Sequence, residues 1–373
     1  MTDQEFQNFL KLRNLLSIEG IGPIRIIKLL QHFETIDRIY SADRIDFEKI
    51  DSFNFNLATR IVNAQNNFQT LAASVEDEIN KLEKLNAQVI TYWDDLYPKI
   101  LRNIYFPPLI LYVIGNLQEL DQHNIAIVGT RKPTDYGKSI AAKFAKELAG
   151  QNITVVSGLA RGIDSIAHRN AIKAGGKTIA IIGSGLDVIY PPENRTLFND
   201  IIQNGAIISE FKLGTKPDAQ NFPRRNRIIS GISLGTLVIE SKKNGGAMQT
   251  ANFAMDQNRE VFAIPGNLTA PESEGTNILI QRNEAKLVTE PEDILLELNL
   301  KIQPVVGENI PKPKIDLNLF EEKIFNCLDS NPKHIDKIAN ETNISTSECL
   351  VSLLSLEFKG LIQQLPGKMF RAI

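Results

Sequence analysis

Residues 125–164 read IAIVGTRKPTDYGKSIAAKFAKELAGQNITVVSGLARGID, and this stretch decides the fold. It contains two continuous runs of apolar and β-branched residues, IAIVG at 125–129 and ITVVSG at 153–158. Runs of this kind are typical of parallel strands that are covered on both faces. The segment 135–150 between them is a helix candidate. A strand, a helix and a second strand in this order predict a parallel βαβ unit.

The same alternation continues along the chain. Further strands are expected at 178–183, 206–210, 236–240 and 261–266, and further helices at 163–174, 193–203 and 247–257. This order predicts a doubly wound α/β sheet.

A small module flanks the sheet on each side. Residues 5–85 read as short helices without a strand pattern, and the C-terminal residues read as three helices and two strands around Pro366-Gly367, which suggests a winged helix. Between sheet and winged helix, Pro304, Pro311 and Pro313 indicate an extended linker. We therefore expect a helical domain at 1–86, an α/β domain at 87–300, a linker at 301–314 and a winged-helix-like domain at 315–373.

The composition limits the number of domains and argues against a membrane protein or a metalloprotein. With 373 residues, 43% of them apolar, the chain is long enough for two or three domains with a buried main core. No signal-peptide pattern or bilayer-length apolar run is present, so we expect a cytoplasmic protein without membrane contact. Cys327 and Cys349 are far from a CxxC spacing, and the four histidines are scattered. We expect no metal site and no cofactor.

Three strand ends carry residues suited to phosphate. Because ligands of open α/β sheets bind beyond the carboxyl ends of the strands, the loops after 125–129, 153–158 and 178–183 are candidate binding loops. Each combines glycine or serine with arginine, so that backbone amides, hydroxyls and guanidinium groups meet an anion together. The candidate residues are Gly129, Thr130, Arg131 and Lys132, then Ser157, Gly158, Arg161 and Gly162, and finally Ser184, Asn194 and Arg195.

A fourth candidate is the segment NFPRRNR at 221–227. It places Arg224, Arg225 and Arg227 beside each other with Asn226, and no carboxylate occurs between Asp218 and Glu240. An anionic ligand is one source of the missing charge; carboxylates from elsewhere in the fold are the alternative. Phe222 either stacks on a base or fills the core, and the sequence does not separate these two roles.

Other nucleotide sites fit less well. The chain has neither a GxxxxGK[ST] P-loop nor a GxGxxG fingerprint. Asp164 and His168 share one helix face, but a helical histidine beside a carboxylate is more often structural, and no nucleophile stands at a suitable spacing.

The ordered motifs VGTRKPTDYG, VVSGLARGIDSIAH, IGSGLDVIYPPEN, NFPRRNRIISGIS and VFAIPG resemble those of the DNA-processing protein A family, DprA/Smf. The resemblance is strong over about residues 90–290. It implies an extended Rossmann-like fold and a non-catalytic, homodimeric protein that binds single-stranded DNA and loads RecA recombinase during natural transformation. The positively charged pocket of the family corresponds here to Gly129-Thr130-Arg131, the SGLARG loop and the arginines of NFPRRNR.

Several positions depart from the family pattern. Pro192 replaces a lysine that the family associates with DNA contact, and Arg195 is placed to compensate. The segment SKKNGGAMQTA differs from the usual serine-glycine-rich version.

The outer modules carry weaker signals. The GIG turn in EGIGPIRIIKLL resembles a helix-hairpin-helix, so the first module is SAM/helix-hairpin-helix-like, although its second helix offers only Arg25 and Lys28 as cations near that turn. The second helix of the expected helix-turn-helix, TSECLVSLLSLEFK, carries two glutamates, which favours a protein contact over major-groove reading.

The rival function is a nucleotide-processing enzyme. SGISLGTLVIE resembles the PGGxGTxxE loop of phosphoribohydrolases, but the leading Pro-Gly-Gly is absent and Glu240 ends a strand. A dinucleotide-dependent redox enzyme lacks support, because ITVVSG ends without an acidic residue to hold a ribose. We therefore expect no ATPase, nuclease or nucleotide-hydrolase activity.

Overall fold

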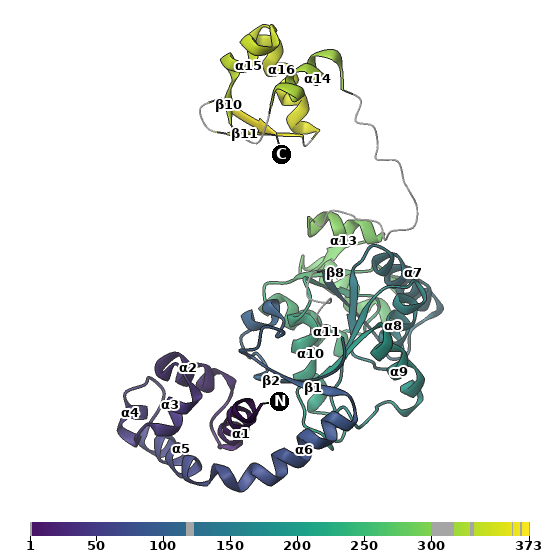
Figure 1. Cartoon of the computed structure of the whole chain (residues 1–373). Coiled ribbons are helices and arrows are strands. Elements are labelled where there is room, and N and C mark those ends of the chain that lie inside the picture. Colours follow the sequence, from purple (N-terminus) through teal and green to yellow (C-terminus); the bar gives the residue numbers. More distant parts are fainter. Residues whose placement is uncertain are drawn as a thin grey trace. The chain divides into compact units, whose positions relative to one another are not determined.

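The computed structural model describes residues 2–116, 123–299, 317–328, 332–359, 361–365 and 368–372. The chain divides into two compact units, residues 1–305 and 306–373, and each is described by itself (Figure 1). The expected linker at 301–314 lies outside the described residues. Within the described part of the chain, no helix is long and apolar enough to cross a membrane.

The first unit begins with a helical module. Thr2 and Glu5 form a capping box at its start, in which the Thr2 hydroxyl accepts from the Glu5 N–H at 3.3 Å. Pro23 begins the second helix, where its missing N–H costs nothing. Fully buried side chains such as Leu10, Leu15 and Ile26 hold the helices together. The helices are α1 (Asp3–Ser17), α2 (Pro23–Phe33), α3 (Ile36–Ser41), α4 (Arg44–Glu48), α5 (Phe55–Asn67), the 3-10 turn η1 (Phe68–Leu71) and α6 (Ala72–Lys84).

A nine-stranded sheet follows, in the order β1-β2-β6-β5-β4-β3-β7-β8-β9. The strand β2 is antiparallel to both of its neighbours, β1 and β6, and all other pairs are parallel. The strands are β1 (Ala87–Thr91), β2 (Ile110–Gly115), β3 (Asn124–Val128), β4 (Thr154–Ser157), β5 (Thr178–Ile181), β6 (Gly205–Ser209), β7 (Gly235–Val238), β8 (Glu260–Ala263) and β9 (Lys286–Leu287).

Helices cover both faces of this sheet. Alternate residues of β3 face opposite sides, since Ile125 and Ile127 belong to one hydrophobic cluster whereas Ala126 and Val128 belong to another. The doubly wound α/β fold is therefore confirmed. The helices and turns of this part are η2 (Lys99–Asn103), α7 (Asp135–Gly150), α8 (Ile163–Lys173), η3 (Pro192–Asn194), α9 (Arg195–Asn204), α10 (Asn221–Gly231), α11 (Gly246–Asp256), η4 (Pro271–Ser273), α12 (Glu274–Gln281) and α13 (Pro291–Glu297).

The second unit is a small helical domain with a three-stranded sheet in the order β10-β12-β11, which confirms the winged-helix-like fold. Ile324, Ile338, Leu353 and Phe370 belong to its core. The expected Pro366-Gly367 turn lies outside the described residues. The elements are α14 (Leu319–Cys327), β10 (Lys333–His334), α15 (Ile335–Thr342), α16 (Thr346–Phe358), β11 (Ile362–Leu365) and β12 (Met369–Ala372).

Candidate functional site

A cleft of about 1120 Å³ opens beyond the carboxyl ends of β3 and β7. The strand order reverses between these two strands, because β4 to β6 lie on one side of β3 whereas β7 to β9 lie on the other. Ligands of open α/β sheets bind at such a switch point, where loops and helix N-termini present backbone N–H groups. The cleft therefore occupies the position at which this fold binds ligands.

The loop after β3 forms one wall of the cleft and contains the first four predicted residues, Gly129 to Lys132. The Thr130 N–H donates to the Glu240 carbonyl at 2.8 Å, and the Thr130 hydroxyl accepts from the Lys132 N–H at 3.2 Å. A side chain at position 129 would place its Cβ 2.5 Å from Ile163 Cγ1, so glycine allows the strand end to approach α8. The backbone of the loop is thus fixed, while Arg131 and Lys132 stay exposed.

Helix α10 supplies the opposite wall with Phe222, Arg225 and Asn226. The guanidinium carbon of Arg131 lies 5.4 Å from the centroid of the Phe222 ring, and that of Arg225 lies 6.0 Å from it. Both distances suit cation–π contact. Phe222 is half-buried and lines the cleft beside both arginines.

Arg225 is buried, with 4% of its surface exposed. Its Nη1 donates to the Gly158 carbonyl at 2.6 Å and also to the Ile181 carbonyl. Burial lowers the pKa of Arg225 to about 10, so the group remains charged at neutral pH. Arg225 therefore places a fixed positive charge in the lining of the cleft.

Asp164 is a buried carboxylate that interacts electrostatically with Arg225. It lines the cleft and accepts N–H groups from Gly158 at 3.1 Å and Ala160 at 3.3 Å. Burial raises the pKa of Asp164 against the opposing influence of Arg225. Asp164 thus orders the loop after β4 and is a structural part of the cleft.

The structure does not bring the three arginines of NFPRRNR together. Arg224 is exposed, with its guanidinium carbon 5.5 Å from the Phe211 ring centroid. Arg227 is mostly buried and pairs with Glu210, its Nη2 lying 2.5 Å from Glu210 Oε2. Neither residue lines the cleft. The segment forms a helix, and 3.6 residues per turn send neighbouring side chains in different directions.

Several side chains that were predicted to donate hydrogen bonds to phosphate donate them to backbone carbonyls instead. The Ser157 hydroxyl donates to the Ile127 carbonyl at 2.7 Å, and the Ser184 hydroxyl donates to the Val188 carbonyl at 2.7 Å. The Asn194 amide donates to the Leu159 carbonyl at 2.9 Å. All three side chains are buried. Because their donors are already used, they position the loops and do not face the cleft.

The remaining predicted residues lie beside the cleft. Gly158 and Arg161 line a small neighbouring hollow together with Arg131 and Phe222. Arg161 is held by Glu193, with 3.1 Å between Nη2 and Oε2. Gly162 has a φ of +78° and precedes α8, and Arg195 is exposed at the start of α9.

Sequence reasoning missed the third side of the cleft, the loop after β7. Lys242 and Lys243 are exposed there, and α11 begins at Gly246 without a side-chain cap. The open N–H groups of a helix start favour anions. The signal was present, because SKKNGG follows a predicted strand and combines lysine with glycine.

The two residues that an alternative catalytic function would use, Glu240 and His168, make structural contacts instead. Glu240 is buried and accepts from the N–H of Thr134 at 2.9 Å and from its hydroxyl at 2.5 Å, so it holds the start of α7. His168 is buried against Thr178, at 2.6 Å between Nδ1 and Oγ1, and forms no hydrogen bond with Asp164. Neither arrangement presents a catalytic group to the cleft.

Comparisons with known proteins cover most of the chain. The family model described as DNA recombination-mediator protein A matches residues 88–299, and the DprA winged helix domain model matches residues 311–368. Protein Smf of Synechocystis is 34% identical over 388 aligned residues, which cover 95% of this chain and 96% of that protein.

Two solved structures are similar to large parts of this chain. DNA processing protein A from Streptococcus pneumoniae has a TM-score of 0.67 and 34% identity, covering 80% of this chain and 99% of that one. DNA processing protein A from Helicobacter pylori has a TM-score of 0.52 and 33% identity, covering 57% of this chain and 96% of that one. The latter structure is described for its single-stranded DNA binding mode.

Proposed function

This chain belongs to the DNA recombination-mediator protein A family, and from that membership we propose that its cleft binds the backbone of single-stranded DNA during DNA processing. The resemblance inferred from the sequence motifs is thereby confirmed. One observation carries the proposal: Arg131, Phe222 and Arg225 meet in a cleft at the switch point of the sheet.

The chemistry of the cleft fits a strand of nucleotides. Arg131, Lys132 and Arg225, with Lys242 and Lys243 across the cleft, supply positive charge for phosphates. The half-buried ring of Phe222 offers a stacking surface for a base, a contact that tolerates any sequence. The Thr130 hydroxyl keeps a proton to donate after accepting from Lys132. Acidic Glu272 and Glu274 at the edge disfavour close approach of phosphates there.

The proposal is tested by the salt dependence of binding. If the cations neutralise phosphates, the logarithm of single-strand affinity falls linearly with the logarithm of salt concentration, with a slope of about −0.7 per contact. Arg131→Ala should weaken binding to every DNA sequence about equally. It should also reduce the magnitude of the slope by about 0.7, the value for one phosphate contact. The exposed Arg38→Ala, on α3, is the matched control. Unchanged affinity and slope for Arg131→Ala would move the DNA site elsewhere.

Two further parts of the proposal rest on family membership. We infer a homodimer that loads RecA recombinase onto incoming strands during natural transformation, in the cytoplasm. Sedimentation velocity tests the dimer. RecA filament formation on strands coated with single-strand-binding protein tests loading, and a protein that binds DNA without accelerating filament formation would contradict it.

A nucleotide-hydrolysing function is not supported by the geometry, because Glu240 is committed to the start of α7. We propose that the protein acts by binding alone.

A further inference from the structure

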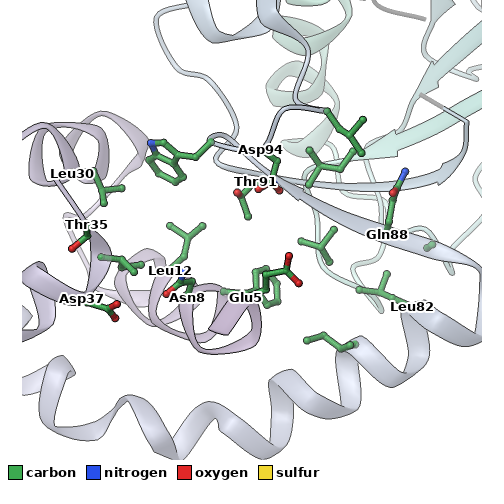
Figure 2. Close-up of a pocket in the computed structure, with 18 of the residues that line it drawn as sticks. Glu5, Asn8, Leu12, Leu30, Thr35, Asp37, Leu82, Gln88, Thr91 and Asp94 are labelled. Atoms are coloured by element: carbon green, nitrogen blue, oxygen red, sulfur yellow. The ribbon is translucent and has the colours of Figure 1, made fainter. Parts of the chain in front are cut away.

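A second cavity of about 820 Å³ lies between the helical module and the edge of the sheet. Helices α1, α2, α3 and α6 and the strand β1 line it, with Trp93 and Leu96 from the loop after β1. Figure 2 shows Leu12 and Glu5 of α1 between Leu30 on one side and Gln88 of β1 on the other. This groove shares no lining residue with the cleft.

The groove is apolar with a negative border. Leu12, Leu30, Ile79 and Leu82 belong to its apolar lining. Among the described residues that line it, every charged side chain is acidic, and none is lysine, arginine or histidine. The acidic residues are Glu5, Glu34, Asp37, Glu83 and Asp94.

Internal contacts leave this border negative. Lys11 pairs with Asp37 at 2.5 Å, and Arg38 pairs with Glu34. The Glu5 carboxylate accepts the Thr2 N–H at 2.7 Å and the Asp94 carboxylate accepts the Thr91 N–H at 2.6 Å, and neither N–H supplies a charge. Two of the five carboxylates are thus paired with a cation in these contacts. A positively charged ligand would complement the other three.

The groove also contains an open strand edge. β1 is the first strand of the sheet and pairs with β2 on one side, and no strand in the described part of the chain pairs with its other edge. The Thr91 N–H donates to Asp94 Oδ2 at 2.6 Å, so it is turned away from β2. Backbone groups alternate between the two edges of a strand, and Val89 therefore presents its N–H and C=O to the same open edge.

We propose that this groove binds an extended segment of a partner protein in which basic and apolar side chains alternate. The segment adds as a strand to β1, where the lining offers carboxylates to its basic side chains and the apolar side chains Leu12, Ile79 and Leu82 to its apolar ones. Main-chain hydrogen bonds to the edge of β1 supply affinity, and the acidic border supplies selectivity.

The fluorescence of Trp93 reports binding in the groove directly. Trp93 is the only tryptophan of the chain, and it lines the groove with 44% of its surface exposed. The probe is the peptide acetyl-KVKVKVK-amide, titrated into the full-length protein. We expect a saturable change in tryptophan fluorescence that weakens with salt. Two control peptides, acetyl-EVEVEVE-amide and a version of the probe with N-methylated valines, should give no change.

Two matched variants test whether the peptide binds in the groove. Glu83→Lys reverses a charge at the groove and should raise the dissociation constant about fivefold. Glu76→Lys makes the same change on the exposed surface of the same helix, outside the groove, and should have no effect. Equal responses of the two variants, equal binding of both charged peptides, or no saturable change would overturn the proposal. A fluorescence change with protein concentration alone that Glu83→Lys abolishes and Glu76→Lys retains would identify a second copy as the occupant and overturn it as well. Single-strand binding by the cleft is measured separately, so either idea can fail without the other.

Discussion

Arg224, Arg225 and Arg227 lie on one helix and differ in their burial and in their contacts. Arg225 lies in the cleft lining, Arg227 pairs with Glu210, and Arg224 is exposed beside Phe211. The sequence predicted that this arginine-rich segment binds an anionic ligand, which stays a prediction, and the structure places one of its arginines in the cleft lining. It could not indicate which arginine reaches the cleft, because Glu210 and the carbonyls that fix Arg225 come from other elements of the sheet.

Arg225 should behave as a structural residue as well as a cleft residue. Arg225→Ala leaves the carbonyls of Gly158 and Ile181 without their donor and creates a cavity, which should cost about 2–4 kcal/mol of unfolding free energy. Arg224→Ala, on the same helix but exposed, should change stability by less than about 0.5 kcal/mol. Urea unfolding of both variants checks this. Equal stabilities would show that the buried contacts of Arg225 contribute nothing.

His168 should make the fold sensitive to acid. The Thr178 hydroxyl donates to the Val155 carbonyl at 2.7 Å, so it accepts from His168 Nδ1–H, and Nε2 has no hydrogen-bond partner among the described residues. Burial lowers the pKa of His168 from 6.5 to about 3. Between these values the unfolded chain binds the proton and the folded chain does not. Stability should therefore fall as pH falls through this window, by up to about 1.4 kcal/mol per pH unit.

The comparison variant is His168→Asn, whose amide can still donate to Thr178 but does not titrate. Asp164 acts in the opposite sense, because its raised pKa favours the folded state at low pH, and it is present in both proteins. Urea unfolding at pH 7, 6 and 5 should show a weaker acid loss for the variant. Parallel pH dependences would remove His168 as the cause.

At the scale of elements, the sequence predicted the sheet well because buried parallel strands are short apolar runs. The strands β3 to β8 all overlap predicted runs. The helix α10 was not predicted as an element, since Pro223 and the run of arginines obscure its apolar face, which Ile228 and Ile229 provide. Ser157 was predicted as a phosphate donor, but its hydroxyl donates to the Ile127 carbonyl of the neighbouring strand β3, a partner that the sequence does not reveal.

The start of α7 depends on Glu240. Glu240→Gln keeps the shape but turns an amide donor toward the Thr134 donors, and should cost about 1 kcal/mol of stability. Glu260→Gln, an exposed residue of β8, is the control and should be neutral. Thermal unfolding measures both. A Glu240→Gln protein of unchanged stability that loses a nucleotide-hydrolysing turnover would instead support the rival enzyme.

For the whole molecule, the described contacts place the proposed DNA site and the peptide groove within residues 1–305, while the winged-helix-like unit forms its own core. Helix α16 of that unit exposes Leu350, Val351 and Leu354 and carries Glu348 and Glu357. An apolar surface with acidic neighbours is unsuited to the phosphates of a DNA groove. The domain boundaries read from the sequence at 86 and 314 stay predictions.

This separation predicts that residues 306–373 are dispensable for binding single strands. A protein ending at Val305 keeps every residue that lines the cleft and the whole compact unit to which they belong. Its affinity and its salt slope should match those of the full chain, because the number of phosphate contacts sets the slope. The control combines the truncation with Arg131→Ala, which should flatten the slope as it does in the full chain. A folded truncated protein that lost affinity together with slope would assign phosphate contacts to the winged-helix-like unit.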